Sequence, residues 1–492
     1  MSDVILAIDQ GTTGTTAVLF DSQFKVISRG YQEFPQIYPT PGCVEHDPDD
    51  IWRSVLASLD AALTMSGINP SDIRAIGITN QRETTVVWNR ETGKPYHNAI
   101  VWQCRRTADI CKDLRDKDCE YLFQKKTGLL LDPYFSGTKL TWYFRNVGAL
   151  KGDASKGSVA AGTIDTFLVW KLTGGKAHVT DVSNASRTLL MDIEKLEWDE
   201  DLCRILEVPM NVLPEIKGST EIFGHTADVP GIPDGISICG IAGDQQAALF
   251  GQACFKPGEA KCTYGTGAFL LMNSGKEPVF SNNKLLTTVA WKLNGETTYA
   301  LEGSTFIAGA AVQWLRDELN IINSASDVEE LAKQVPDTGG VTMVPAFVGL
   351  GAPHWRAEAR GIIAGLTRGT NRAHLARAVL EGIALQNVEI LSAMESDSKR
   401  KLLSLKVDGG ASKNNLLMQM QADLLGCTII RPEMVEATAL GAALLAGIGA
   451  GFINNTSEIT GLWDTYDSFE PEIDDGEREA ALKRWQNIVD KA

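Results

Sequence analysis

The sequence lacks the cysteine and histidine groupings that hold metal ions or form disulfide frameworks. Its nine cysteines stand singly with no C-x-x-C pair, and its six histidines are scattered along the chain. Cys104, Cys111 and Cys119 come nearest to a cluster, and their spacing fits no zinc pattern. An odd number of separated cysteines in a chain of 492 residues is typical of a reduced protein. We therefore expect a cytoplasmic protein with free thiols.

Basic charge is also scarce, since 46 Lys and Arg stand against 62 Asp and Glu, a net charge of -16. A nucleic-acid partner requires a basic surface, so this balance argues against one. A long apolar span is missing as well: the longest uncharged stretch, residues 437–457, is rich in Ala and Gly and becomes polar at Asn454. That composition predicts a buried, close-packed helix. We expect no stable membrane insertion and, because a strand pattern begins at Val4, no signal peptide.

No G-K-[ST] motif of a P-loop occurs, yet two Gly/Thr turns are suited to phosphate binding. The stretch VILAIDQGTTGTTAVLFD, residues 4–21, predicts strand, turn and strand, because the residues after the turn are few and β-branched. In such a hairpin Gly11 and Gly14 allow unusual φ angles, and Thr hydroxyls with backbone N–H groups can form an anion-binding nest. The pattern recurs in EAKCTYGTGAFLLMNSG, residues 259–275. Two such units predict two similar halves, each with a phosphate-binding hairpin.

Strand and helix patterns alternate around both hairpins, which predicts an α/β protein with an N-terminal domain of residues 1–250 and a C-terminal domain of residues 251–492. Residues 47–67 are expected as a helix, because Asp47 suits its N-cap and Gly67 its C-terminal end. Other strands are expected at 25–34, 73–79, 235–243 and 402–410, and other helices at 304–320, 372–394 and 415–426, with an exposed closing helix at 474–492.

Acidic or amide side chains follow four of the expected strands, at Asp9, Asn80, Asp244 and Asp408. Ligands of α/β proteins bind at the carboxyl ends of strands. An acid beside phosphate-binding turns is suited to hold Mg²⁺ or to accept the proton of a hydroxyl group. The alternative is that each Asp caps the turn or helix that follows it. Four such residues in this arrangement favour a ligand site.

A second group of side chains is suited to a polyol. Arg82 and Glu83 stand side by side between two strand patterns, and a hydroxyl group needs both a donor and an acceptor. Trp102 ends a strand pattern, while Tyr134 and Phe135 lie in a Pro-bearing loop. Aromatic rings in such places can cover the C–H face of a small sugar or polyol. The alternatives are a solvated ion pair on a surface hairpin and ordinary core aromatics.

The sequence resembles the FGGY family of carbohydrate kinases, and within it most closely the members that phosphorylate glycerol. The motifs that carry the resemblance run nearly from end to end and include AIDQGTTG, YPTPGCVEHDP, GITNQRETTVVW, NAIVWQCRR, DPYFSGTK, GIAGDQQAALFGQ, TYGTGAFLLMN, GLGAPHW and VDGGASKNN. The resemblance implies the actin/hexokinase/chaperone ATPase type of fold, with two ribonuclease-H-like domains and the active site in the cleft between them. It implies phosphoryl transfer from ATP to glycerol, giving sn-glycerol 3-phosphate, with Mg²⁺, in glycerol uptake and catabolism.

The resemblance also implies roles for individual residues. Asp244 is the general base, and Asp9 positions Mg²⁺ directly or through water. The glycerol contacts fall on Arg82, Glu83, Trp102, Tyr134, Asp244, Gln245 and Phe269. The nucleotide contacts fall on Thr12, Thr13, Gly14, Thr266, Gly309, Gln313, Gly410 and Asn414.

Two departures from the family pattern change what is expected. Many members carry Arg where this chain has Thr16, so a positive charge near the phosphates must come from elsewhere or nucleotide affinity is lower. Residues 225–236 lack the Gly-rich, Arg-bearing loop through which some bacterial relatives bind a sugar bisphosphate inhibitor, so that regulation is not expected. Family members are commonly homodimers or homotetramers, and the same is expected here.

Two other functions stay open at this point. One is a kinase of the same fold that acts on a different polyol or a ketose. The other is an actin-like or chaperone-like nucleotide switch with no small-molecule substrate. Both kinase and switch need the two phosphate hairpins. Only the kinase needs the Arg82-Glu83 and Asp244-Gln245 sets, so their presence favours a kinase.

Overall fold

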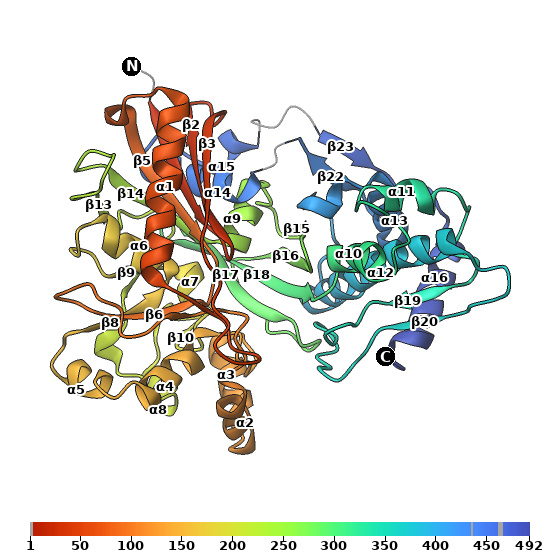
Figure 1. Cartoon of the computed structure of the whole chain (residues 1–492), viewed down its shortest axis with the longest axis horizontal. Coiled ribbons are helices and arrows are strands. Elements are labelled where there is room, and N and C mark those ends of the chain that lie inside the picture. The colour runs from red at the N-terminus through yellow and green to blue at the C-terminus, as the bar shows by residue number, and fades with distance from the viewer. Residues whose placement is uncertain (1–2, 434–435, 461–465) are drawn as a thin grey trace.

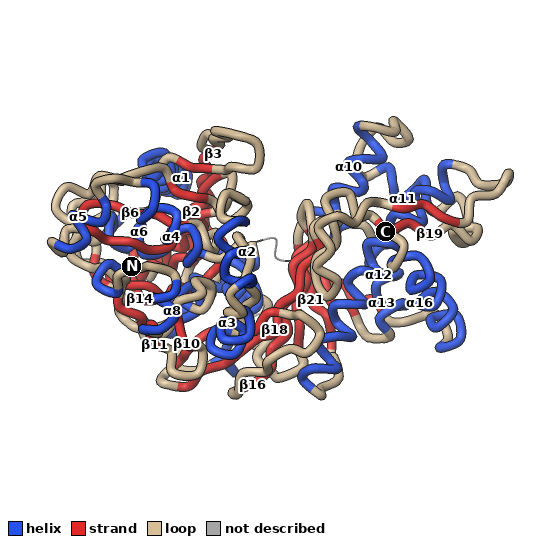
Figure 2. The backbone as a smooth tube through the Cα atoms, turned by 90° about the horizontal axis from the view of Figure 1, so that it is seen from below, coloured by secondary structure: helices blue, strands red, loops and turns tan. Residues whose placement is uncertain are grey.

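The computed structural model describes residues 3–433, 436–460 and 466–492. The chain forms two lobes that meet along a long antiparallel hairpin of strands β17 (Leu286–Leu293) and β18 (Glu296–Thr305) (Figure 1). The two lobes are also distinct when the molecule is seen from below (Figure 2). Each lobe is built on one large sheet that contains one of the predicted Gly/Thr hairpins.

The strands of the first large sheet are β1 (Val4–Gln10), β2 (Gly14–Phe20), β3 (Val26–Glu33), β5 (Ile73–Asn80), β13 (Gly224–His225) and β14 (Ser237–Gly243). Their order is β13-β14-β5-β1-β2-β3, with β14, β5 and β1 parallel and β1 paired antiparallel with β2. The predicted first hairpin is therefore confirmed. Its register places Asp9 opposite Thr16 on one side and Thr79 on the other.

Smaller sheets and helices complete the first lobe. The small-sheet strands are β4 (Glu45–His46), β6 (Thr85–Asn89), β7 (Ala99–Ile100), β8 (Val159–Thr163), β9 (Val179–Asp181), β10 (Met191–Asp192), β11 (Glu197–Trp198) and β12 (Glu215–Lys217). The helices are α1 (Pro48–Ser66), α2 (Ala108–Asp116), α3 (Glu120–Thr127), α4 (Ser136–Asn146), α5 (Leu150–Ser155), α6 (Ile164–Leu172), α7 (Val182–Ala185), α8 (Glu200–Ile205) and α9 (Asp244–Gly251).

Helix α1 packs against β2 and β3 and begins and ends as its capping residues predict. The Asp47 side chain accepts a hydrogen bond from the Asp49 N–H, which satisfies one of the free donors of the first turn. Gly67 takes the left-handed conformation with φ 64° and donates its N–H to the Leu63 carbonyl. These local signals fix the helix bounds without help from the rest of the chain.

The second large sheet holds β17, β18 and five further strands: β15 (Glu259–Tyr264), β16 (Ala268–Gly275), β21 (Ser404–Asp408), β22 (Ile429–Pro432) and β23 (Tyr466–Phe469). The order is β17-β18-β16-β15-β21-β22-β23, and the β15–β16 pair is the second predicted hairpin. Strands β19 (Thr342–Val344) and β20 (Ile362–Ala364) form a separate pair. The helices that follow are α10 (Gly309–Asp317), α11 (Asp327–Ala332), α12 (Arg372–Ser398), α13 (Asn415–Leu425), α14 (Ala437–Gly449), α15 (Thr456–Ile459) and α16 (Asp475–Val489).

One glycine at each hairpin turn, Gly14 in the first and Gly267 in the second, is needed for close packing. The expectation that Gly11 and Gly14 adopt unusual φ angles is wrong, because neither lies in the left-handed region. A Cβ on Gly14 would lie 2.8 Å from the Gln32 carbonyl oxygen of the next strand. A Cβ on Gly267 would lie 2.2 Å from the Thr305 carbonyl oxygen. Both turns are thus pressed against neighbouring backbone, where any side chain would force a shift.

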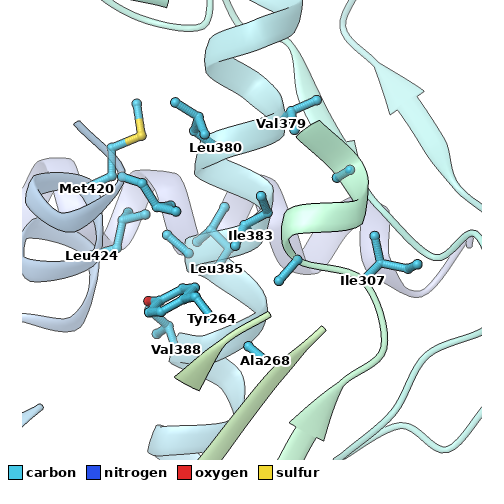
Figure 3. Close-up of a cluster of buried hydrophobic side chains, with 14 of the residues drawn as sticks. Tyr264, Ala268, Ile307, Val379, Leu380, Ile383, Leu385, Val388, Met420 and Leu424 are labelled. Atoms are coloured by element: carbon cyan, nitrogen blue, oxygen red, sulfur yellow. The ribbon is translucent and has the colours of Figure 1, made fainter. Parts of the chain in front are cut away.

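The core of the second lobe lies between its sheet and helix α12 (Figure 3). Ile383 and Val388 of α12 lie toward the strand residues Tyr264 and Ala268 in this cluster. The long apolar pattern at 372–394 is thus confirmed as a buried helix. The helix predicted from residue 304 is wrong in its first turn, because the β16–β18 ladder continues to Thr305 and the helix starts at Gly309.

Helix α14 returns to the first lobe, where it packs on β1, β5, β14 and α9. A Cβ on Gly441 would lie 1.9 Å from the Ala247 carbonyl oxygen, which explains the small residues of this segment. The expectation of a buried, close-packed helix is confirmed. Across the described residues, none of the helices has the length and apolar character that a membrane crossing requires. The prediction that the closing helix is exposed is only partly right, because Trp485 of α16 is fully buried.

Candidate active site

Three predicted strand-end residues converge in the first lobe. Gln10 pairs with Asn80 and Gly243 pairs with Asn80 in the parallel ladders, so the ends of β1, β5 and β14 lie side by side. Asp9 therefore lies next to the loop after β5 and close to Asp244, which is the first residue of α9. The sheet register thus brings three of the four predicted strand ends together. The fourth, Asp408, ends β21 in the second large sheet, where its Oδ2 accepts from Gln252 Nε2 at 2.6 Å.

The two acids of this site are both harder to ionise than ordinary carboxyl groups. Burial raises the pKa of Asp9 to about 7, and repulsion by Asp244 and Glu436 adds to this, while Arg29 acts in the opposite direction. Burial also raises the pKa of Asp244, against the attraction of Arg82 and Lys261. Two buried carboxyl groups that lie side by side and repel each other form a site that would gain from a cation.

Arg82 and Glu83 are not a solvated surface pair, because the exposed fraction of each side chain is 1%. They lie 3.9 Å apart, and each has a closer ionic partner elsewhere. Arg82 holds Glu302 through both terminal nitrogens, at 2.5 and 2.9 Å, and its Nε lies 3.2 Å from Asp244 Oδ1. Glu83 accepts from Arg187 Nε at 2.7 Å. Both residues are therefore rigidly held at the edge of the site.

Sequence reasoning missed four residues that hold these groups in place. Glu302 and Arg187 bind Arg82 and Glu83, and Gln246 Oε1 accepts from Arg82 at 3.3 Å. Lys261 donates to Gln245 Oε1 and, at 2.9 Å, to Thr263 Oγ1. Gln246 lies in the quoted motif GIAGDQQAALFGQ and Lys261 in the second hairpin segment. No pattern, however, sets Glu302 or Lys261 apart from ordinary strand residues.

The predicted aromatic residues come together above the polar groups. The Trp102 ring meets the Tyr134 ring edge to face at 5.6 Å and the Phe269 ring at 6.3 Å. Trp102 Nε1 also donates to Thr12 Oγ1 at 2.9 Å, which ties the aromatic group to the first Gly/Thr turn. Tyr134 accepts from Arg82 at 3.3 Å. Phe135, by contrast, is fully buried and belongs to the core.

The Gly/Thr turns leave their threonines accessible. Thr13 and Thr266 are exposed, while Gly14 is buried against β3. The Gly309 N–H, at the start of α10, donates to the Gly265 carbonyl at 3.0 Å, so the helix N-terminus lies directly behind the second turn. A Cβ on Gly309 would lie 2.7 Å from that carbonyl oxygen. A turn backed by a helix N-terminus is a suitable place for an anion.

The remaining predicted nucleotide residues lie around this second turn. Strand β21 runs parallel to β15, and a Cβ on Gly409 would lie 2.4 Å from the Tyr264 carbonyl oxygen. Gly410 is exposed with open space around it, and Gln313 is exposed on α10. Asn414 caps α13 by accepting from the Leu417 N–H at 2.9 Å. Asn414 therefore caps a helix in the ligand-free protein, and its nucleotide role stays a prediction.

A magnesium ion is compatible with the residues present. In the described ranges no group of three or more His, Cys, Asp and Glu side chains is arranged to hold a metal ion by itself. Magnesium, however, is usually bound by one or two carboxylates together with substrate phosphates and water. Asp9 and Asp244 supply two adjacent carboxyl groups whose mutual repulsion a cation would relieve.

Comparison with known proteins agrees with this geometry. Models of the N-terminal and C-terminal domains of the FGGY family of carbohydrate kinases match residues 4–251 and 260–450. The chain is 56% identical over 490 residues to a glycerol kinase of Myxococcus xanthus, covering 99% of each chain. It is 54% identical over 489 residues to a glycerol kinase 2 of Thermotoga maritima, covering 99% of this chain and 98% of the relative.

A solved structure extends the similarity to the whole fold. The crystal structure of Plasmodium falciparum glycerol kinase with ADP is 39% identical and has a TM-score of 0.94, covering 99% of this chain and 98% of that chain. The expected two-domain kinase fold is thereby confirmed. The chain belongs to the FGGY family of carbohydrate kinases.

Proposed function

We propose that this protein transfers the terminal phosphoryl group of ATP to glycerol, giving sn-glycerol 3-phosphate. The observation that carries the proposal is one juxtaposition. Asp244 stands at the start of α9, 3.2 Å from Arg82, and the aromatic group of Trp102, Tyr134 and Phe269 adjoins both Gly/Thr turns. Relatives with names of glycerol kinases, at 54–56% identity over nearly the whole chain, support the choice of substrate.

Glycerol has a polar edge of three hydroxyl groups and a hydrocarbon edge. Arg82 donates to the hydroxyl groups, Glu83 and Asp244 accept from them, and Gln245 does either. Trp102 and Phe269 cover the hydrocarbon edge. Arg82 binds Glu302 through short contacts and reaches its other partners at 3.2–3.3 Å, and substrate hydroxyl groups replace these longer contacts.

Asp244 acts as the general base. Its carboxylate accepts the proton of the attacking hydroxyl group while that oxygen forms a bond to the γ-phosphorus and the bond to the ADP oxygen breaks. Burial raises the pKa of Asp244 and so strengthens it as a base, whereas the positive charges of Arg82 and Lys261 stabilise its ionised form. Such a base typically contributes about 10²–10⁴ in rate.

The phosphates lie between the two hairpin turns. Thr12, Thr13 and Gly14 contact them from the first lobe and Thr266 from the second. The adenosine end lies against Gly309, Gln313, Gly410 and Asn414. Asp9 holds Mg²⁺, directly or through water, with Asp244 nearby. Magnesium supplies neutralisation of the charge that develops on the phosphates.

The wider setting of the reaction is also a proposal. We place it in the cytoplasm, in glycerol uptake and catabolism, and we expect a homodimer or homotetramer. The domain boundary is proposed at residues 250 and 251. That division follows the sequence order, although α14 packs on the first lobe.

A coupled ADP-release assay tests the function directly. Glycerol is compared with a panel of ketoses and other polyols, and Asp244→Asn serves as the control variant. Glycerol-dependent release that falls by about 100-fold or more in Asp244→Asn supports the proposal. A preference for a ketose would point to another kinase of this fold. Release that is independent of any polyol and unchanged in Asp244→Asn would point to a nucleotide switch.

A further inference from the structure

A buried chain of alternating charges crosses the site in the order Glu83, Arg187, Glu302, Arg82 and Asp244. The successive N···O distances are 2.7 Å, 2.9 Å, 2.5 Å and 3.2 Å. The first four side chains have exposed fractions of 0–2%, whereas that of Asp244 is 31% exposed. Asp244 is therefore the most accessible member of the chain of charges.

Glu302 is the member that comes from the other lobe. It lies on β18 in the second large sheet, whereas its two cationic partners belong to the first lobe. It accepts from both terminal nitrogens of Arg82 and, through Oε1, from Arg187 as well. Although burial opposes ionisation, Arg187 and Arg82 together lower the pKa of Glu302 to about 2. Its two arginine partners thus favour the anionic form of Glu302, and these ion pairs join the two lobes.

The contacts of Arg82 divide into two classes. The bidentate pair with Glu302 measures 2.5 and 2.9 Å and is the strong arrangement for a guanidinium and a carboxylate. The contacts to Asp244, Gln246 and Tyr134 measure 3.2, 3.3 and 3.3 Å. A substrate hydroxyl group can replace the longer contacts without releasing Glu302. The guanidinium therefore keeps its orientation while its outer N–H groups change partners.

Stability alone does not account for this arrangement. Burying charges costs desolvation energy, and apolar replacements of buried ion pairs are often as stable or more stable. Arg187 also leaves its buried Nη1 without a hydrogen-bond partner among the described residues, which adds to the cost. The network costs desolvation energy and lies directly behind the candidate substrate residues. A positioning role therefore explains it better than a contribution to stability does.

We propose that Glu302 is a positioning residue for Arg82, with Arg187 fixing Glu83 and the far side of Glu302 in the same way. The inference rests on the proposed function, since Arg82 and Glu83 are the groups that hold the polyol. It adds that the second lobe orients the polyol site of the first. Arg82 is aligned only while β18 is seated against the first lobe.

The test is steady-state kinetics of full-length Glu302→Gln, with separate KM values for glycerol and for ATP. We expect kcat/KM for glycerol to fall by about 100-fold, because a misplacement of about 1 Å costs this much. The KM for ATP should change by less than about threefold, because the side chains that Arg82 contacts are not among those proposed to hold the nucleotide. Glu296→Gln is the matched control, since Glu296 lies on the same strand and pairs at the surface with Lys276. It should leave all constants unchanged.

A second variant and a second measurement keep the proposal testable if Glu302→Gln does not fold. Arg187→Lys keeps the charge but loses the forked donor, and the KM for glycerol should rise by about tenfold. A crystal structure of either variant without ligand should show the Arg82 guanidinium turned away from its present direction. Unchanged glycerol constants, or an unmoved Arg82, would overturn the positioning role. A wild-type protein that releases no ADP with glycerol would instead overturn the proposed function, and the ligand-free structure would still decide the position of Arg82.

Discussion

Asp9 should make the ligand-free protein less stable than it would be with a neutral side chain. Its pKa is raised from 3.8 to about 7 by burial and by the nearby Asp244 and Glu436, with Arg29 only partly offsetting them. The ionised form is therefore disfavoured in the folded state. Asp9→Asn removes that charge and keeps the size of the side chain. We expect this variant to be more stable than the wild type at neutral and alkaline pH.

The change of stability with pH follows from the proton that Asp9 binds in the folded and in the unfolded state. Below about pH 4 both the folded and the unfolded protein are protonated at Asp9. Between 3.8 and about 7 only the folded state keeps the proton, so stability falls as the pH rises. Above about 7 the loss is complete. From about pH 5.5 to about pH 8, the contribution of Asp9 to the free energy of unfolding should fall by up to about 2 kcal/mol.

Thermal unfolding of the ligand-free protein in metal-free buffer measures this effect. The difference in Tm between Asp9→Asn and wild type should grow by about 2–4 °C between these two pH values, because a chain of this size unfolds with a large entropy change. Asp60→Asn on α1 is the control, because Asp60 is exposed and should show no such growth. A difference in Tm that is the same at both pH values would refute the reasoning. So would an Asp9→Asn protein that is less stable than the wild type at pH 8.

Two further substitutions test the hairpin turns. Thr16→Arg places a guanidinium in register with Asp9. The KM for ATP should then fall about fivefold, which is equivalent to about 1 kcal/mol. An unchanged KM would argue against any role for this position. Gly267→Ala should cost about 1–3 kcal/mol of stability, because its Cβ would lie 2.2 Å from the Thr305 carbonyl oxygen. Gly265→Ala, whose Cβ has its nearest contact at 3.7 Å, should leave the Tm unchanged, and equal losses in both variants would contradict the close-packing argument.

Features set by local chemistry could be predicted from the sequence. The bounds of α1 follow from Asp47 and Gly67, whose capping bonds reach only two to four residues along the chain. Both Gly/Thr hairpins follow from β-branched runs on each side of a short turn. The meeting of Asp9, Asn80 and Asp244 follows from the general rule that parallel strands end at one edge of a sheet.

Features that depend on distant partners could not be predicted. Glu302 bonds to Arg82 across 220 positions of the chain, and no spacing rule connects a strand residue to a loop so far away. The close packing that requires glycine at Gly14 and Gly267 could not be predicted either, because the backbone pressed against each of them belongs to another strand. The start of α10 was misplaced because pairing of β18 with β16 outweighs the helical pattern before Gly309.

The contacts that Asp244 makes in the ligand-free protein bear on how the proposed kinase avoids hydrolysing ATP when no polyol is bound. Arg82 lies 3.2 Å from the Asp244 carboxylate, and its attraction opposes the rise in the pKa of Asp244 that burial causes. In the ligand-free protein the carboxylate is therefore a weaker base than burial alone would make it. A substrate hydroxyl group that takes the Arg82 Nε donor releases the carboxylate and brings the proton it is to accept. A water molecule gains less, because it cannot bind the aromatic group and Arg82 at the same time. In the proposed mechanism the substrate therefore completes its own base, and the proposed role of Glu302 is to keep Arg82 in the place where this exchange can occur.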